Sequence, residues 1–287
     1  MSVQFSALIS PVNCPNHGTE LDCAHCGVRS LSVCGALHDD ELVAFEKMSK
    51  TISFNVRETL FEQDEPSESV YNITAGSVRL YKLLPDGRRQ IVGFALPGDF
   101  LGLALSERNV FSADALTPVT ACQFSRSTFS EMLDEKPHLL RRLHSIASHE
   151  LTLAQDQMVI LGRRTAEEKV AAFLIGLRKR WGRVNASNLH IPLPMTRQDI
   201  GDFLGLTVET VSRMLTRMAR EKTIVIVPDG VRLLDVARID HDLPYHRVMR
   251  CRYQVNRSDV ATDFADHGRK AREGAVVPRV DLDAERD

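Results

Sequence analysis

Apolar and polar residues alternate from about residue 53 to residue 129, with glycines and turn residues between the alternating stretches. This pattern is typical of short antiparallel strands whose side chains point in turn to the core and to solvent. The tripeptide Pro85-Asp86-Gly87 has the residues of a tight turn between two such strands. Just upstream, residues 37–48 repeat apolar positions every third residue behind acidic ones, which predicts one short helix. We therefore expect residues 37–136 to form a β-roll, or jelly roll.

The spacing of the apolar residues changes at about Pro137. They now follow one another at intervals of three and four, which predicts a long helix over residues 137–162 with a narrow apolar seam. The seam consists of Leu140, Leu143, Ala147, Leu151, Ala154, Met158 and Leu161. Such a helix either lies along its own β domain or pairs with the same helix of a second copy. We favour a homodimer, because the stripe is narrow and its two alanines would let a partner helix approach closely.

The sequence MTRQDIGDFLGLTVETVSRMLTRMARE carries the most specific pattern in the chain. Thr196 and Asp199 have the spacing of a capping box at the start of a helix. Gly205 suits the tight turn that ends this helix, and Thr207 can cap a second one. Two short helices in this arrangement form a helix-turn-helix, whose second helix enters the major groove of DNA.

The second of these helices places polar residues on its outer face. Arg213 can donate two hydrogen bonds to guanine, Glu209 can accept one from cytosine, and Ser212 can adapt to either role. A hairpin that turns at Pro228-Asp229-Gly230 follows the motif, so residues 163–238 are expected to form a winged helix-turn-helix. The candidate DNA-binding residues are Thr207, Glu209, Ser212, Arg213, Arg197 and Arg217, the last two as phosphate contacts.

The charge distribution supports a polyanionic partner for this segment alone. The chain has a net charge of −2, but residues 162–238 carry about +6 of charge. No run approaches the roughly 18 apolar residues of a membrane span, and the first ten residues lack the pattern of a secretion signal. We expect a cytoplasmic protein without membrane contact. Residues 239–287 mix charges of both signs with few apolar clusters, so we expect a disordered tail there.

Cysteines gather in the first 36 residues, a segment that we interpret as a cysteine-rich loop. Cys23, Cys26 and Cys34 have the spacing C-x2-C-x7-C, and Cys122 lies among the predicted strands. Four thiolates can hold a [4Fe–4S] cluster, and zinc also accepts four cysteines. Spacing alone therefore leaves three interpretations open: an iron–sulfur cluster, zinc, or thiols without a metal.

A β-roll, a long helix and a winged helix-turn-helix, in that order, resemble the cyclic AMP receptor/FNR (CRP/FNR) superfamily of bacterial transcription regulators. The stretches LTVETVSRML and RRTAEEKVAAFL are similar to the FNR branch in particular. This resemblance implies an α+β fold with a cyclic-nucleotide-binding-like β-roll, and a DNA-binding protein that is not an enzyme. It further implies that Glu209, Ser212 and Arg213 read TTGAT half-sites of a palindrome, and that the partners are promoter DNA, a second copy and RNA polymerase.

The resemblance also bears on cofactors. In the FNR branch, three N-terminal cysteines and one β-roll cysteine ligate an oxygen-labile [4Fe–4S] cluster, which implies Cys23, Cys26, Cys34 and Cys122 here. The protein would then sense oxygen and act mainly as an activator of anaerobic or microaerobic metabolism, with nitrogen fixation among the candidate processes. In the cyclic AMP branch, a glutamate and an arginine bind the nucleotide; Leu103 and Phe111 occupy those positions here, so no cyclic nucleotide is expected.

Two other interpretations compete with the oxygen sensor. One is a FixK-like regulator of the same fold without a cluster, or a zinc or thiol redox sensor. The other is an electron-transfer or redox enzyme that uses the cluster, against which stands the absence of a glycine-rich cofactor loop, a nucleophile motif or a paired acid–base site in the sequence.

Overall fold

Three short 3₁₀ turns form the first part of the chain that the structure describes, and they carry Cys23 and Cys34. The structure is a computed structural model and describes residues 23–102, 106–184 and 189–241. The turns are η1 (Cys23–His25), η2 (Arg29–Leu31) and η3 (Val33–Ala36). Val28 and Val33 are buried, so the described part of the predicted cysteine-rich loop packs into the protein.

The predicted β-roll is confirmed as two antiparallel sheets. One has the strand order β1-β8-β3-β6, and the other has the order β2-β7-β4-β5. The strands are β1 (Ser49–Phe54), β2 (Thr59–Phe61), β3 (Ser69–Ala75), β4 (Val78–Leu83), β5 (Arg89–Ala95), β6 (Phe100–Leu101), β7 (Ser112–Ala115) and β8 (Val119–Ser125). The turn at Pro85-Asp86-Gly87 joins β4 to β5 as predicted, with Gly87 at a φ of 81° that an L side chain rarely adopts.

A helix that the sequence analysis missed follows the last strand of the β-roll. Strand β8 ends at Ser125, and α2 (Arg126–Glu135) begins directly after it. Phe129, Met132 and Leu133 are buried on one face of α2. Their spacing of three and four is helical, but we had extended the strand pattern to Phe129 and so overlooked it.

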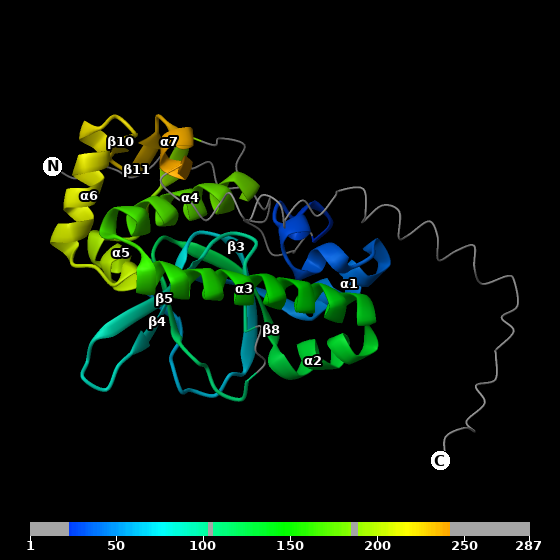
Figure 1. The fold of residues 1–287 in the computed structure, drawn as a ribbon. Helices are drawn as coiled ribbons and strands as arrows, with labels where there is room; N and C mark the ends of the chain where they lie inside the picture. The colour runs from blue at the N-terminus through cyan, green and yellow to red at the C-terminus, as the bar shows by residue number, and fades with distance from the viewer. Residues whose placement is uncertain (1–22, 103–105, 185–188, 242–287) are drawn as a thin grey trace, which may run out of the picture. The chain divides into compact units, whose positions relative to one another are not determined.

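The two helices predicted from apolar spacing are present. They are α1 (Asp39–Lys47) and α3 (Pro137–Arg163). Proline at the first position of α3 suits a helix start, because no intrahelical partner is available there for an amide hydrogen. Figure 1 shows α3 running from beside α2 to beside α5 (Arg197–Leu204). At that far end the Gln157 side chain donates a 3.1 Å hydrogen bond to the Phe203 carbonyl of α5.

Glu41 joins α1 to the start of α3. Its carboxylate accepts hydrogen bonds from the His38 amide at 2.9 Å and from Lys136 Nζ at 2.8 Å, and it lies 2.9 Å from His138 Nε2. The bond from Lys136 is the main cause that lowers the pKa of Glu41 to about 2. Because the folded state lowers this pKa, the contribution of Glu41 to stability is present above its unfolded value and is lost as the pH falls toward 2.

We expect Glu41→Gln to lower the free energy of unfolding by about 1 kcal/mol at pH 7, because the ion pair is lost while the amide can still accept one hydrogen bond. The difference from the parent should shrink below about pH 4, where the carboxylate of the unfolded chain becomes protonated. Denaturant unfolding at several pH values measures both effects, with Glu131→Gln on an exposed face of α2 as the control. A difference that stays constant with pH would contradict this account.

The helix-turn-helix has the capping that the sequence predicts. Thr196 caps α5, and the Thr196 and Asp199 side chains complete a capping box. Gly205 ends α5 in the left-handed conformation, with a φ of 62°. Thr207 then caps α6 (Val208–Arg220) by accepting a hydrogen bond from the Thr210 amide at 3.2 Å. The prediction of two helices joined by a glycine turn is confirmed at residue level.

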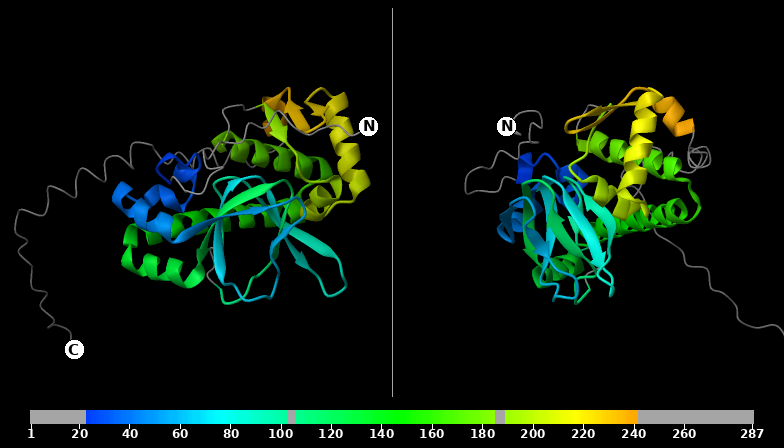
Figure 2. Two further views of the ribbon diagram at one scale, coloured as in Figure 1. Left: turned by 180° about the vertical axis from the view of Figure 1, so that it is seen from behind. Right: turned by 90° about the vertical axis from the view of Figure 1, so that its left-hand side faces the viewer.

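The wing is a three-stranded sheet. It consists of β10 (Ile224–Val227), β11 (Gly230–Leu233) and β9 (His190–Pro192), which was not predicted. The two views in Figure 2 show the wing, in orange, beside α6, in yellow. A last helix, α7 (Val236–His241), crosses the predicted start of the tail at residue 239, and Ile239 is buried in the core. That boundary was therefore wrong: one buried side chain on a short helix gives no periodic signal. Residues 242–287 lie outside the described residues.

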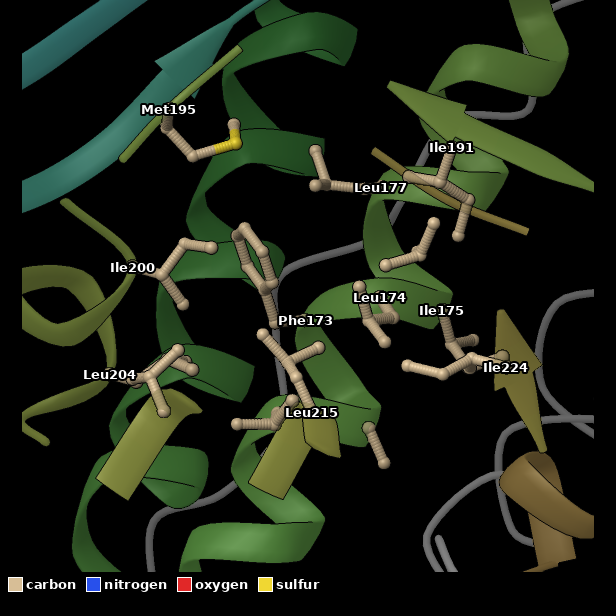
Figure 3. Packing of buried hydrophobic residues seen from close by; sticks show 14 of the residues in the cluster. Phe173, Leu174, Ile175, Leu177, Ile191, Met195, Ile200, Leu204, Leu215 and Ile224 are labelled. Atoms are coloured by element: carbon tan, nitrogen blue, oxygen red, sulfur yellow. The ribbon is translucent and has the colours of Figure 1, made fainter. Parts of the chain in front are cut away.

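The DNA-binding domain is built around α4 (Ala166–Val184). This helix begins at Ala166, because α3 itself continues to Arg163. Figure 3 shows Phe173 and Leu174 of α4 packed among apolar side chains of α5, α6 and the wing. Three β-roll residues, Ile91, Phe94 and Leu96, belong to the same cluster. None of the helices among the described residues has the length and apolar character that crossing a membrane requires.

Candidate functional site

The structure brings the four predicted cluster ligands together. Cys23, Cys34 and Cys122 are buried in one apolar cluster, although Cys122 lies on β8 and the other two lie on η1 and η3. Cys26 is half-buried. Leu139 and Leu143 of α3 belong to the same cluster, so the long helix forms part of its wall.

The charges of these cysteines affect one another's pKa values. Burial, together with the charge of Cys26, raises the pKa of the Cys34 thiol to about 11. Burial raises the pKa of the Cys122 thiol as well, and the charges of Cys34, Cys23 and Cys26 add to this effect. If these buried thiols were ionised, the thiolates would need a cation beside them to offset their charge. Metal binding supplies such a cation and releases the thiol protons.

The surroundings of these thiols fit a bound group. Asn72 lies directly opposite Cys122 on the neighbouring strand β3, and its side chain is on the same face of the sheet. Asn72 is 1% exposed, and its Oδ1 atom has no hydrogen-bond partner within the described part of the chain. A buried amide without a partner is uncommon and is consistent with a further polar group beside it. Four soft sulfur donors match the thiolate ligation of a [4Fe–4S] cluster.

The described residues contain no site for a single metal ion. In residues 23–102, 106–184 and 189–241, no three cysteine, histidine, aspartate or glutamate side chains converge as they would around a single metal ion. Cys14 and Cys251, which we did not assign as ligands, lie outside the described residues.

The recognition helix presents the predicted polar face. Glu209 and Arg213 are exposed on α6 and Ser212 is half-buried, whereas Val211 and Leu215 face the core. Backbone and Thr207 hydrogen bonds at the helix start hold the pKa of Glu209 below its ordinary value. Glu209 is therefore a hydrogen-bond acceptor only, as cytosine recognition requires.

The two predicted phosphate contacts, Arg217 and Arg197, are less available to DNA than Glu209 and Arg213. Arg217 forms ion pairs with Glu221 at 2.9 Å and with Glu167 at 3.1 Å, so its charge is already partly matched within the chain. Arg197, at the start of α5, is half-buried, and burial lowers its pKa. Contact with a phosphate would require Arg217 to exchange its carboxylate partners.

One residue of the predicted dimer seam is wrong. Leu143 is only 6% exposed because it packs against the cysteine cluster of its own chain. His144 is exposed. With His144 in place of Leu143, successive seam residues lie four and three positions apart in regular alternation. The seam that we now predict consists of Leu140, His144, Ala147, Leu151, Ala154, Met158 and Leu161. Leu140 is 49%, Leu151 60% and Met158 64% exposed, so this face of α3 is available to a partner.

We expect Leu151→Ala to weaken dimerisation by about thirtyfold, because two copies each lose about 1 kcal/mol of apolar burial at the seam. Sedimentation equilibrium under anaerobic conditions measures the change. Leu153→Ala is the matched control, since Leu153 is on the same helix and 39% exposed but lies outside the heptad positions. Equal weakening by both substitutions would show that the seam is not the interface.

The sequence analysis missed a charged cluster between the β-roll and the helix-turn-helix. Arg89 of β5 contacts Asp199 and Asp202 of α5, each at 2.7 Å. Arg79 of β4 contacts Asp199 at 3.2 Å and Asp114 of β7 at 2.7 Å. No local pattern indicates such pairs. In the sequence Asp199 is visible only as part of the capping box, and the structure shows that its side chain is also buried, at 1% exposure.

The residues at the predicted nucleotide positions of the β-roll have other surroundings. The Phe111 ring lies 5.9 Å from the Phe61 ring, between ring centroids. Nearby, Arg108 donates a hydrogen bond to the Asp64 carbonyl. Leu103 lies outside the described residues.

Two family models match the chain. The model for the cyclic nucleotide-binding domain matches residues 51–136. The model for bacterial regulatory proteins of the crp family matches residues 193–224, which contain the helix-turn-helix.

Relatives with named roles match about three quarters of the chain. The transcriptional activatory protein AadR of Rhodopseudomonas palustris is 55% identical over 216 residues, which is 75% of this chain and 90% of that protein. The nitrogen fixation regulation protein FixK of Bradyrhizobium diazoefficiens is 51% identical over 218 residues, which is 76% of this chain and 92% of that protein. The solved structure of FixK2 from Bradyrhizobium japonicum aligns with a TM-score of 0.63 and 36% identity, over 67% of this chain and 96% of that one. This chain therefore belongs to the CRP/FNR family and is a transcription regulator, not an enzyme.

Proposed function

We propose that the protein is an oxygen-responsive transcription regulator that binds a [4Fe–4S] cluster through Cys23, Cys26, Cys34 and Cys122. It acts in the cytoplasm as a homodimer joined by α3 and recognises palindromic TTGAT-type promoter sites. It contacts RNA polymerase there and acts mainly as an activator of anaerobic or microaerobic metabolism, with nitrogen fixation among the candidate processes. The burial of Cys23 and Cys34 in one apolar cluster with Cys122, which lies about ninety residues later in the chain, is the observation that carries this proposal.

The contacts of α3 explain how a group at the cysteines would affect DNA binding. The helix packs on the cysteine cluster through Leu139 and Leu143 and exposes the dimer seam on another face. A bound cluster supplies the oxygen-reactive chemistry. Cys23 of η1, Cys34 of η3 and Cys122 of β8 would hold it. The position of α3, which packs beside these cysteines through Leu139 and Leu143, would then be fixed as well. A correctly placed pair of α3 helices then sets the two α6 helices for successive major grooves.

We do not propose a cyclic nucleotide as a cofactor, although the cyclic nucleotide-binding model matches the β-roll. Phe111 has no guanidinium to pair with a sequestered phosphate, and its ring packs against another aromatic ring. The Arg108 guanidinium is nearby but is bonded to a backbone carbonyl.

One observation favours the alternative of a regulator without a cluster. Burial raises the pKa of the Cys34 thiol to about 11, so without a metal this thiol stays protonated at neutral pH, and burial shifts the pKa of Cys122 in the same direction. Such a protein would resemble a regulator whose cysteines are only structural.

Anaerobic purification decides between these functions. We expect brown protein with about four irons and four acid-labile sulfides per chain. It should bind a TTGAT palindrome as a dimer, and air exposure should remove both the colour and the tight binding. Colourless, iron-free protein that binds the palindrome equally well would refute the sensor and leave the cluster-free regulator, and stoichiometric zinc would identify a zinc protein instead.

A further inference from the structure

Arg142 of α3 reaches across to the segment between two of the cysteines. Its Nη2 atom donates to the Ser30 carbonyl at 3.0 Å and to the Leu31 carbonyl at 3.3 Å, and its Nε atom donates to the Ser32 carbonyl at 3.2 Å. One guanidinium therefore holds three consecutive backbone carbonyls. A guanidinium can do this with donors on separate nitrogen atoms of one rigid plane, whereas the three donors of lysine share one nitrogen atom and match this arrangement less well.

The atoms that Arg142 holds are directly connected to Cys34. Ser32 is fully buried, and its hydroxyl accepts a 3.2 Å hydrogen bond from the Cys34 amide. Leu31 packs on the other side of the segment against Gly98, where an added Cβ atom would lie 2.7 Å from the Leu31 Cβ atom. The segment is thus fixed by α3 on one side and by the β-roll on the other.

Arg142 also stands between two faces of the same helix. Leu139, Leu143 and Ile146, at helical spacing around it, pack on the cysteine cluster. Leu140 and Leu151 are exposed on the dimer seam. If residues 30–32 moved, the Arg142 side chain would move α3, and the seam on α3 would move with it.

We propose that Arg142 is the positioning residue that couples the state of the cysteine site to dimerisation. This inference rests on the proposed function. Three carbonyls face the guanidinium only while η2 and η3 keep their observed turns. When the segment loosens, the acceptors separate and α3 loses the charge-assisted bonds that hold it in place. The cysteine site with its bound group would then favour one position of α3, and the empty site would favour another. Coupling between two sites requires such a difference.

The test compares dimer affinity with and without the cluster in three chains: the parent, Arg142→Gln and Arg141→Gln. Arg141 is exposed on α3 next to Arg142, so its variant has the same change of charge and side chain. Sedimentation equilibrium under anaerobic conditions gives the dimer Kd for reconstituted and for iron-free protein. Iron, sulfide and the absorption spectrum show whether each chain holds the cluster.

We expect the cluster to tighten dimerisation by about tenfold or more in the parent and in Arg141→Gln. In Arg142→Gln the ratio should fall below about threefold although iron and sulfide are unchanged, and Arg142→Lys should give an intermediate ratio. A structural defect alone would weaken both forms equally and keep the ratio, which would overturn the proposal.

The other outcomes are equally decisive. If Arg142→Gln cannot hold the cluster whereas Arg142→Lys holds it with the full ratio of the parent, Arg142 serves ligand assembly and does not act as the coupling residue. If the parent itself binds iron but shows no change in dimer affinity, the dimerisation step of the proposed function fails, and the role of Arg142 fails with it. A parent that binds no iron refutes the proposed function at its first step.

Discussion

Cys122→Ala is expected to yield protein with less than about one iron per chain after anaerobic reconstitution, compared with about four for the parent. Cys122 is the one candidate ligand on a rigid strand, and its sulfur interacts with all three others. Without it, the thiols of η1 and η3 have no fixed partner in the β-roll. Iron and sulfide analysis measures the loss, and the absorption spectrum should lose its iron–sulfur bands.

The variant also separates sensing from DNA reading. Because Cys122 is buried beside Ala121 in β8, an alanine leaves only a small cavity, and circular dichroism should show the parent fold. Binding to promoter DNA should become weak in the absence of oxygen and insensitive to air. Cys251→Ala provides the control, since that cysteine is not among the four. Full iron content in Cys122→Ala would exclude this cysteine as a ligand.

Arg213→Ala is expected to weaken binding to a TTGAT palindrome by about a hundredfold or more, because each dimer loses one guanidinium per half-site. Arg213 is exposed on α6, and its Nη2 atom donates only a 3.2 Å hydrogen bond to the Thr210 hydroxyl of the same helix. Replacing it should therefore leave dimerisation and cluster content unchanged. Fluorescence anisotropy at a fixed salt concentration measures the affinity.

A change of base tests whether Arg213 reads sequence. The parent should lose about 1–3 kcal/mol per half-site when the guanine of TTGAT is replaced, whereas Arg213→Ala should bind both sites equally. Arg220→Ala, on an exposed position near the end of α6, should weaken binding to both sites by the same factor, as a phosphate contact does. Retained discrimination in Arg213→Ala would assign base reading to other residues.

The sequence predicted those parts of the fold that depend on local chemistry. Thr196, Asp199, Gly205 and Thr207 occupy the predicted caps and turn because capping requires only a few neighbouring residues. The strands of the β-roll were predicted from alternating apolar and polar residues, and the length of α3 from the spacing of its apolar residues. The tail boundary failed where a single side chain, Ile239, connects a short helix to the core.

The site was predicted less completely because its contacts are long-range. The spacing of Cys23, Cys26 and Cys34 shows a ligand pattern, but it does not show that α3 forms a wall of the site. Periodicity assigned Leu143 to the seam, since a stripe of apolar residues cannot distinguish a partner chain from the chain's own β-roll. Arg142 looked like an ordinary surface arginine, because backbone carbonyls are acceptors that no sequence motif reveals.

Asp199 caps the first helix of the DNA-reading motif and also receives both Arg79 and Arg89 from the β-roll. Domain exchange is constrained by this double use. A hybrid regulator that joins this helix-turn-helix to a foreign sensory domain without the two arginines would inherit a carboxylate that has lost its guanidinium partners at a domain junction. Successful recombination within the family should therefore transfer the three residues together.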